Sequence, residues 1–241
     1  MRIPLMAVAL LLPQDAPVED KAADQAIETF KTAYKAQAEA DRADAVSKLA
    51  EAVHVKTLSK LSLILTSSDG PRVRLAAAKG MGQFAAVKKQ AVASLSNAFT
   101  ACAKDPAIQA GILQALGALD DPSSLALIHR SFEDKEPAVV KAALAAAAAM
   151  KNAGSIDPLI AFLAKCEKSH KAKSGGATNV PLPSGNLSVN AARPEDLLKM
   201  LQEFMEATNL SLQTISEQNL STSAEWTIWW NKSRGTFKPR K

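Results

Sequence analysis

Aromatic side chains are scarce in this sequence: its 241 residues include one Tyr, three Trp and seven Phe, although 47% are hydrophobic. Strand-forming β-branched residues are also few, and Ala and Leu supply most of the apolar side chains. Ala and Leu are the strongest helix formers among apolar residues, whereas β-branched and aromatic residues favour strands. The sequence therefore predicts an all-α protein with enough apolar residues to bury a core.

Cysteine and histidine are rare too: the two cysteines are Cys102 and Cys166, and no two of the three histidines stand four residues apart. Because there is no CxxC motif, the usual zinc patterns and a disulfide framework are excluded. Gly-rich phosphate loops, GxSxG and HExxH are missing as well. We therefore expect buried thiols, no metal, no cofactor and no enzyme activity. One alternative stays open, a nucleophilic pairing of Cys102 with His129 between adjacent helices.

A dense basic patch is also missing, apart from the tail KPRK at 238–241. The net charge is +5, but residues 1–70 hold eight Lys and Arg against ten Asp and Glu, so the remainder of the chain carries the excess. Proteins that bind nucleic acid usually concentrate positive charge on one face. The distribution favours an ordinary solvated surface, and sequence-independent nucleic-acid or polyanion binding stays as an alternative function.

Residues 1–16 are an apolar start to the chain. Arg2 precedes a run of ten residues without charge, from Ile3 to Leu12, which Pro4 interrupts. Ten residues are too few to span a bilayer, so we expect no transmembrane span, but the arrangement resembles a short secretory signal. We predict a signal peptide or an apolar arm at 1–16 and an exported protein, periplasmic or secreted, with a cytoplasmic one as the alternative.

Three segments of the chain align without gaps: PRVRLAAAKGMG (71–82), PAIQAGILQALG (106–117) and PAVVKAALAAAA (137–148). Their prolines are 35 and 31 residues apart, and a small residue follows each proline by eleven positions, at Gly82, Gly117 and Ala148. A shared pattern at this period is typical of stacked helical repeats. Proline marks the start of each helix, because its missing N–H costs nothing at the first helical position.

Each of these helices, helix A of its repeat, is followed after a short turn by a second apolar-periodic stretch, helix B. Asp–Pro pairs mark further helix starts, since aspartate accepts from the free amides there; they are Asp105–Pro106, Asp121–Pro122 and Asp157–Pro158. Stacked helix pairs also explain the alanine-rich run at 142–149, because small side chains let helix axes approach closely. We expect these alanines to serve packing.

The remaining segments predict the two ends of the array. Residues 17–168 are expected to form the solenoid, with a polar cap helix within 18–37 and a degenerate first helix pair within 41–67. Residues 169–193, rich in Gly, Ser, Asn and Pro, predict a flexible linker. Residues 194–241 predict a C-terminal helical cap that buries Trp226 and Trp229 or Trp230, with partner anchoring by the tryptophans as the alternative.

The proline-led helices A and the helices B after them resemble HEAT repeats of the phycobilisome-lyase type. The resemblance covers roughly residues 40–168 and implies a right-handed α-solenoid of about four helix pairs with N- and C-terminal capping helices. The ending TSAEWTIWWNKSRGTFK (222–238) is similar to that of exported bacterial HEAT-repeat proteins, many from planctomycetes, of unassigned function. In that group a Thr-Gly-Glu turn precedes the tryptophans, whereas TISEQNLS (214–221) lacks the glycine.

HEAT arrays mostly bind other macromolecules, so the resemblance implies a non-catalytic scaffold for a protein partner of unknown identity. Helix B usually lines the concave side of such arrays, and its exposed positions are the expected contacts. We predict a protein-binding site at Lys88, Lys89, His129, Arg130 and Lys165. A lyase-like or enzyme-accessory HEAT protein is a further alternative, implied by the bilin lyases that contain related repeats.

Overall fold

The computed structural model describes residues 19–175 and 193–239. Within these ranges the chain forms eleven α-helices, four 3-10 segments and no strand. None of the described helices is both long and apolar enough to cross a membrane. The helices are α1 (Asp20–Ala33), α2 (Glu39–Ala50), α3 (Val55–Leu65), α4 (Pro71–Met81), α5 (Lys88–Ala101), α6 (Pro106–Leu119), α7 (Leu125–Arg130), α8 (Pro137–Met150), α9 (Ile156–Ser174), α10 (Pro194–Ser216) and α11 (Ser223–Ser233).

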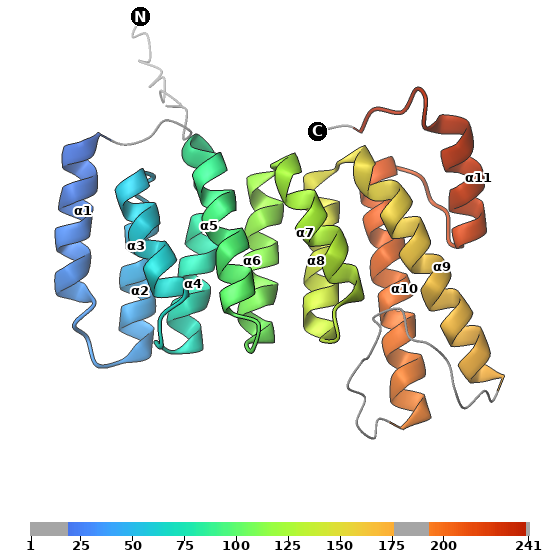
Figure 1. Cartoon of the computed structure of the whole chain (residues 1–241), viewed down its shortest axis with the longest axis horizontal. Helices are drawn as coiled ribbons and strands as arrows, with labels where there is room; N and C mark the ends of the chain where they lie inside the picture. Colours follow the sequence, from blue (N-terminus) through green and yellow to red (C-terminus); the bar gives the residue numbers. More distant parts are fainter. Residues whose placement is uncertain (1–18, 176–192, 240–241) are drawn as a thin grey trace, which may run out of the picture.

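The helices stack in two layers to form an elongated α-solenoid (Figure 1). Helices α2, α4, α6, α8 and α10 pack side by side in one layer, which we call the helix-A layer. Helices α3, α5, α7 and α9 make the helix-B layer, and each packs against the helix A that follows it. At the ends, α1 packs on α2 and α3, and α11 packs on α9. The prediction of an all-α solenoid is confirmed.

The predicted helix starts are confirmed where proline leads helix A, since α4, α6 and α8 begin at Pro71, Pro106 and Pro137. The Asp–Pro pairs behave less uniformly. Asp121 caps as predicted, accepting from the backbone N–H of Ser123 at 2.9 Å. Asp105–Pro106 marks the start of α6 as predicted, but Asp105 makes no side-chain cap hydrogen bond. The prediction for Asp157–Pro158 is wrong, because α9 begins at Ile156, before that pair.

Close contact between neighbouring helices A explains the small residues of the repeat. A Cβ atom on Gly82 would lie 3.1 Å from the Cα of Ala115, and one on Gly117 would lie 2.8 Å from the Cα of Ala146. Both distances are shorter than ordinary van der Waals contact between carbon atoms. Four alanines of α8 are buried in the same packing, Ala142, Ala143, Ala146 and Ala147. The predicted packing role is confirmed for Gly82, Gly117 and these four alanines, whereas Ala148 is only half-buried and Ala145 and Ala149 are exposed.

Arginine at the fourth residue of a helix A joins successive repeats. Arg42 of α2 donates to Asp69 across 2.8 Å, and Arg74 of α4 donates to Asp105 across 3.0 Å. The ion pair with Arg74 explains why Asp105 does not cap α6. Tyr34, which follows α1, donates its hydroxyl to the same Asp69 carboxylate. These side chains tie the turn after α1 to the loop that precedes α4.

The predicted linker at 169–193 begins too early, because α9 continues to Ser174 and carries His170 as a helical residue. Residues 176–192 and the predicted signal peptide or apolar arm at 1–16 lie outside the described residues. The C-terminal segment extends the array rather than only capping it. Helix α10 packs on α8 and α9 as a further helix A, and the Ser211 hydroxyl donates to the Leu144 carbonyl at 3.0 Å.

Helix α11 seals this end with tryptophans, as predicted. Trp226 is 0% exposed and donates its indole N–H to Asn209 Oδ1 at 2.8 Å, and Trp230 is 7% exposed. Thr222 and Glu225 form a reciprocal capping box at the start of α11. Before that box, Glu217 ends α10 in the left-handed conformation, with φ 58°. A glutamate therefore occupies backbone geometry that glycine adopts without strain.

Candidate protein-interaction face

The five residues predicted to bind a partner all lie in the helix-B layer, but in two places. Lys88 and Lys89 begin α5, where the Lys88 ammonium donates to the Asp120 carbonyl at 3.4 Å. His129 and Arg130 end α7, and Lys165 lies on the neighbouring α9. The structure therefore brings His129 and Lys165 together, places Arg130 beside His129 at the end of α7, and leaves the two α5 lysines apart.

A cavity of about 150 Å³ lies between α7 and α9 and is lined by two of these residues, His129 and Lys165. The rest of its wall is largely apolar, from Phe132, Pro158, Ala161 and Phe162. A 3-10 segment, Ser131–Glu133, follows the six-residue α7, and its Phe132 is 2% exposed. The shortness of α7 thus gives the cavity an aromatic wall.

His129 is held in place by a buried serine. Its Nε2 lies 2.9 Å from the Ser155 hydroxyl, and its ring centroid is 5.6 Å from that of Phe132. Burial lowers the pKa of His129 below its usual value, so the ring is neutral at pH 7. Ser155 is 0% exposed, which leaves its hydroxyl no access to a substrate. This serine–histidine contact therefore positions the ring at the cavity wall.

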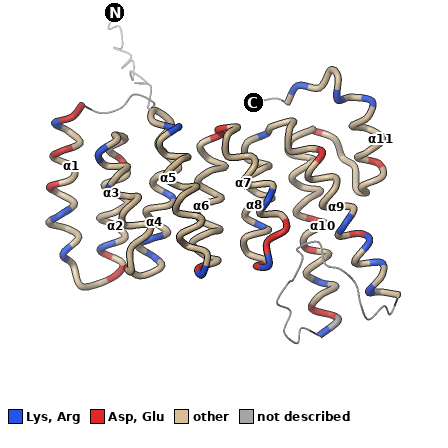
Figure 2. The backbone as a smooth tube through the Cα atoms, viewed as in Figure 1, with Lys and Arg blue, Asp and Glu red and all other residues tan. Residues whose placement is uncertain are grey.

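Charged residues border the cavity on the α9 side. Lys165 forms an ion pair with Glu133, and both side chains are about half exposed, at 52% and 56%. Beyond Lys165, the exposed Lys168 and Lys171 follow at three-residue spacing, so each lies beside the next in a row that turns by about 120° around α9. Basic residues accordingly gather along the C-terminal half of α9 (Figure 2). The sequence prediction missed Lys168 and Lys171, although their spacing was visible in it.

Residues 95–172, which run from α5 to α9 and include the cavity, match a family model described as HEAT repeats. The chain is a HEAT-like α-solenoid. No match to it was found among curated proteins. The family match and the layered helices support a HEAT-repeat protein, and HEAT repeats generally serve as scaffolds for protein interaction.

The cysteines of this HEAT-like array are structural. Both are free and buried, as predicted, and burial raises the pKa of the Cys166 thiol to about 12. Cys102 Sγ lies 3.1 Å from an Arg74 nitrogen, whereas His129 contacts Ser155. The alternative pairing of Cys102 with His129 is therefore wrong. In the described part of the chain, no three His, Cys, Asp or Glu side chains gather as metal ligands would.

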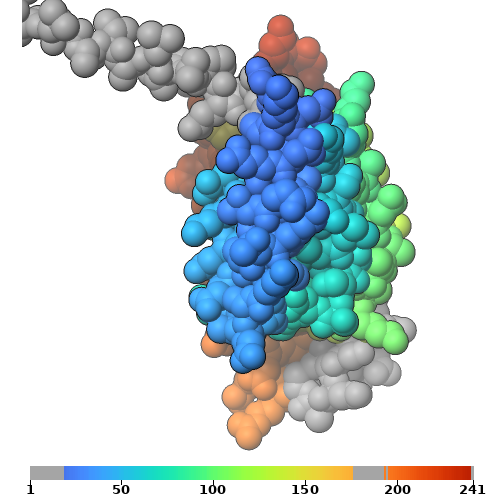
Figure 3. Space-filling model, turned by 90° about the vertical axis from the view of Figure 1, so that its left-hand side faces the viewer, coloured from blue at the N-terminus to red at the C-terminus, as the bar shows by residue number. Residues whose placement is uncertain are grey.

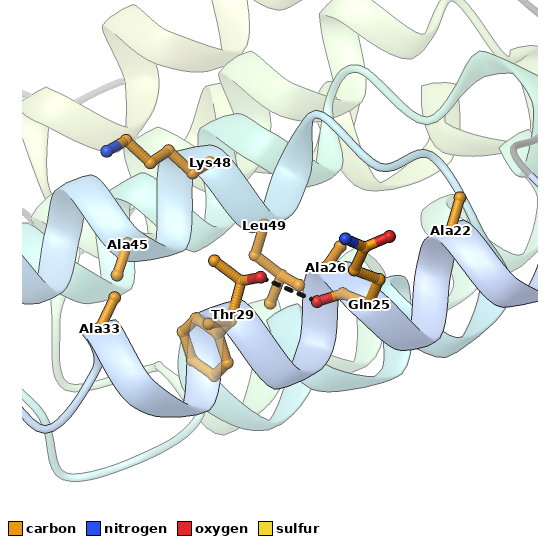
Figure 4. Close-up of a pocket in the computed structure, with 9 residues that line it drawn as sticks. Ala22, Gln25, Ala26, Thr29, Ala33, Ala45, Lys48 and Leu49 are labelled. Carbon is orange, nitrogen blue, oxygen red and sulfur yellow. Dashed lines mark hydrogen bonds between the residues drawn. The ribbon is translucent and has the colours of Figure 1, made fainter.

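Two larger grooves lie away from the α7–α9 cavity. One, of about 320 Å³, runs between α1 and α2 at the N-terminal end, where α1 is the outermost helix (Figure 3). Its walls are mainly apolar, with Ala26 and Leu49 facing each other across it (Figure 4). The other, of about 420 Å³, lies between α4 and α6 and is bordered by Lys79 and Gln114. Neither groove contains a residue of the predicted site.

Proposed function

We propose that this protein is a non-catalytic scaffold that binds a protein partner through its helix-B layer. The observation that carries the proposal is the cavity between α7 and α9, which combines an apolar wall with the polar His129 and Lys165. Specific protein interfaces combine an apolar centre with a polar rim in this way. The HEAT match supports the same conclusion, since it spans the helices that form the cavity.

A role without catalysis is supported by the state of the reactive side chains. Ser155, Cys102 and Cys166 are each at most 2% exposed, so none of these nucleophiles faces the solvent. A catalytic nucleophile needs access to its substrate and a neighbouring base. We therefore expect the purified protein to bind without chemically changing its partner.

The test is affinity capture from the native source with charge-reversal variants of the full chain. We expect Lys89→Glu with Arg130→Glu to lose a protein that the unchanged chain captures, because both side chains are exposed on the helix-B layer. The matched control is Lys48→Glu with Lys79→Glu, two exposed lysines of the helix-A layer. Helical circular dichroism must be unchanged in both. A partner captured equally by all three proteins contradicts binding at the helix-B layer.

Binding of nucleic acid or another polyanion is the second candidate. It is favoured by the exposed lysines along α9, which could follow a phosphate backbone. Such binding falls steeply as salt rises, because counterions are released on association. Retention on heparin at low salt, with elution by a modest salt step, would support it. If binding of the captured partner did not change with salt concentration, polyanion binding would be excluded.

We further propose that the protein is exported, as in the bacterial group whose ending resembles 222–238. The support is the apolar start at 1–16 and the tryptophan-bearing ending. Fractionation of the native source, with mass spectrometry of the N-terminal peptide, tests this location. Recovery of the intact chain starting at Met1 in the cytosol alone would contradict it.

A further inference from the structure

The acidic side chains on the α7–α9 face are already engaged within the protein. Glu133 forms its ion pair with Lys165, and Asp157 accepts from Arg234 at 3.3 Å. Glu167 accepts from both the backbone N–H of Ser223, at 2.9 Å, and its hydroxyl, at 2.5 Å. Glu133 and Asp157 are thus paired with cations, whereas Glu167 is held by neutral donors and keeps its charge, so one unpaired carboxylate remains on the face.

The basic side chains of the same face are not engaged in this way. Arg130, Lys168 and Lys171 are exposed, and none of the three forms an ion pair or a side-chain hydrogen bond within the described residues. Three like charges beside satisfied carboxylates produce a local positive potential. A partner segment with carboxylates at matching positions would complement that potential.

The cavity between α7 and α9, which Lys165 borders three residues before Lys168, fits one apolar side chain. Its volume is about 150 Å³, and Phe132, Phe162, Pro158 and Ala161 form most of its wall. An apolar cavity of about this size in another protein accommodates benzene. A group of this size buried at the centre of a polar ring is the usual form of an interface anchor.

We propose that the partner contributes an acidic segment with one apolar anchor, which seats the anchor in the α7–α9 cavity and turns its carboxylates toward Arg130, Lys168 and Lys171. The inference rests on the proposed function and names the partner chemistry of that same site. Electrostatic attraction guides the segment to the face, and the cavity fixes its register. A nucleobase carries polar edges that the apolar wall would leave without hydrogen-bond partners, which is why we favour a peptide.

The first experiment selects 12-residue peptides from an unbiased random display library against the full-length protein. Enriched sequences should contain several Asp or Glu around a Leu, Ile, Met or Val. Enrichment of basic or uncharged peptides overturns the inference. So does a selection that enriches no peptide, provided that the same library yields binders to a control target. The proposed function is tested separately, by the capture experiment with the Lys89 and Arg130 variants. A failure of the peptide selection can therefore be distinguished from a failure of the proposed function.

The second experiment measures the selected peptide against charge-neutralised proteins. Combining Arg130→Gln, Lys168→Gln and Lys171→Gln should weaken binding about tenfold at 0.15 M salt, because each exposed charge pair contributes modestly. The matched control neutralises three exposed lysines on α2, α4 and the turn after α1, which are Lys48, Lys79 and Lys35. The control removes the same charge from the chain and should leave affinity within twofold. If both proteins lost the same affinity for the peptide, the loss would reflect the net charge of the chain and not this face, and the inference would be overturned.

The third experiment blocks the cavity. Ala161 is exposed and lines the cavity, whereas Ala145 is exposed on α8, in the helix-A layer, and does not line it. Ala161→Trp should weaken the peptide about tenfold or more, and Ala145→Trp should have little effect. A single-stranded oligonucleotide is measured in parallel. If Ala161→Trp leaves peptide affinity unchanged, or if the oligonucleotide binds as tightly as the peptide, the face is a general polyanion surface and the inference is overturned.

Discussion

At the C-terminal end of the array, α11 places Trp226 and Trp230 against the last helices, with Trp229 stacked on Trp230 at a centroid distance of 5.7 Å. At the N-terminal end, α1 buries only Ala23 and Phe30 and leaves the groove of about 320 Å³ beside α2. That end is also held by polar contacts, because Asp69 accepts hydrogen bonds from both Arg42 and Tyr34.

Both ends solve the same physical problem, since a terminal repeat exposes an apolar face that has no neighbour. Burial of aromatic surface depends little on pH, whereas a charged hydrogen-bonded cluster requires defined protonation states. The two ends should therefore respond differently to substitution and to pH. The five predictions below test that difference.

The largest effect is expected from Trp226→Ala at the C-terminal end. Trp226 is 0% exposed and also donates to Asn209, so its removal leaves a cavity and an unpaired amide oxygen. We expect a loss of about 3–5 kcal/mol in the free energy of unfolding, measured by urea denaturation followed by far-ultraviolet circular dichroism. The control is Ile228→Ala on the same helix, because Ile228 is 58% exposed and its removal should change little. Similar losses from both would mean that α11 does not seal the array.

A smaller effect is expected from Asp69→Asn at the N-terminal end. The Arg42 and Tyr34 hydrogen bonds lower the pKa of Asp69 to about 2, and burial followed by the Asp69 contact raises the pKa of Tyr34 to about 12. Loss of the charge should destabilise the protein by about 1–2 kcal/mol at pH 7. Asp24→Asn, which removes an exposed ion-pair partner of Lys56, is the control and should have little effect.

The same cluster should give the N-terminal end a pH dependence with a defined sign. Because its folded pKa is lowered, Asp69 stabilises the protein fully above about pH 5 and loses this contribution as pH falls through about 4 toward 2. Because its folded pKa is raised, Tyr34 contributes below about pH 10 and loses its contribution as pH rises toward 12. The difference in the free energy of unfolding between the unchanged protein and the Asp69→Asn variant should therefore be smallest at acidic pH. A constant difference down to pH 2 would contradict the assignment.

Much of the helix-A layer could be predicted from the sequence, because proline and small residues at fixed spacing act locally. Pro71, Pro106 and Pro137 each begin a helix, and Gly82 and Gly117 each lie at a helix contact. The pairing of Arg42 with Asp69 could not be predicted, since it depends on how successive repeats superpose in space. The position of Arg42 in its helix was still informative, because Arg74 occupies the same place in the next repeat and also forms an ion pair with an aspartate.

The candidate site was predictable only in part. His129 and Lys165 were chosen as exposed helix-B residues, and the structure places both at one cavity. Lys171 is missing from the predicted site because the predicted linker begins at residue 169, where apolar periodicity ends but the helix does not. Lys168 lies within the predicted solenoid, and its spacing from Lys165 could have identified it. Helix α9 continues to Ser174, where Gly175 follows it, so its end is set by the local breaker and not by the loss of apolar residues.

A groove-filling substitution should stabilise the N-terminal end. Thr29 is exposed and lines the groove between α1 and α2 (Figure 4), so Thr29→Leu would add apolar contact there. Thr32→Leu is the matched control, because Thr32 is also exposed on α1 and also donates its hydroxyl to the carbonyl four residues earlier, but it does not line the groove. Both substitutions raise helix propensity. The free energy of unfolding should rise by about 0.5–1 kcal/mol more for Thr29→Leu than for the control, as measured by thermal or urea unfolding. Equal gains would mean that the groove does not contribute to closure of this end.

The smallest effect is expected at the turn that leads into the tryptophan helix. Glu217 has φ 58°, a conformation that strains a residue with a Cβ atom. Glu217→Gly should relieve that strain but add backbone entropy to the unfolded chain, for a net gain of about 0.5 kcal/mol. Lys151→Gly tests the same geometry inside the array, at φ 45° after α8, and should give a similar gain. If Glu217→Gly destabilises while Lys151→Gly stabilises, the glutamate side chain itself holds the turn, and closure of the C-terminal end depends on a polar contact as well as on the tryptophans.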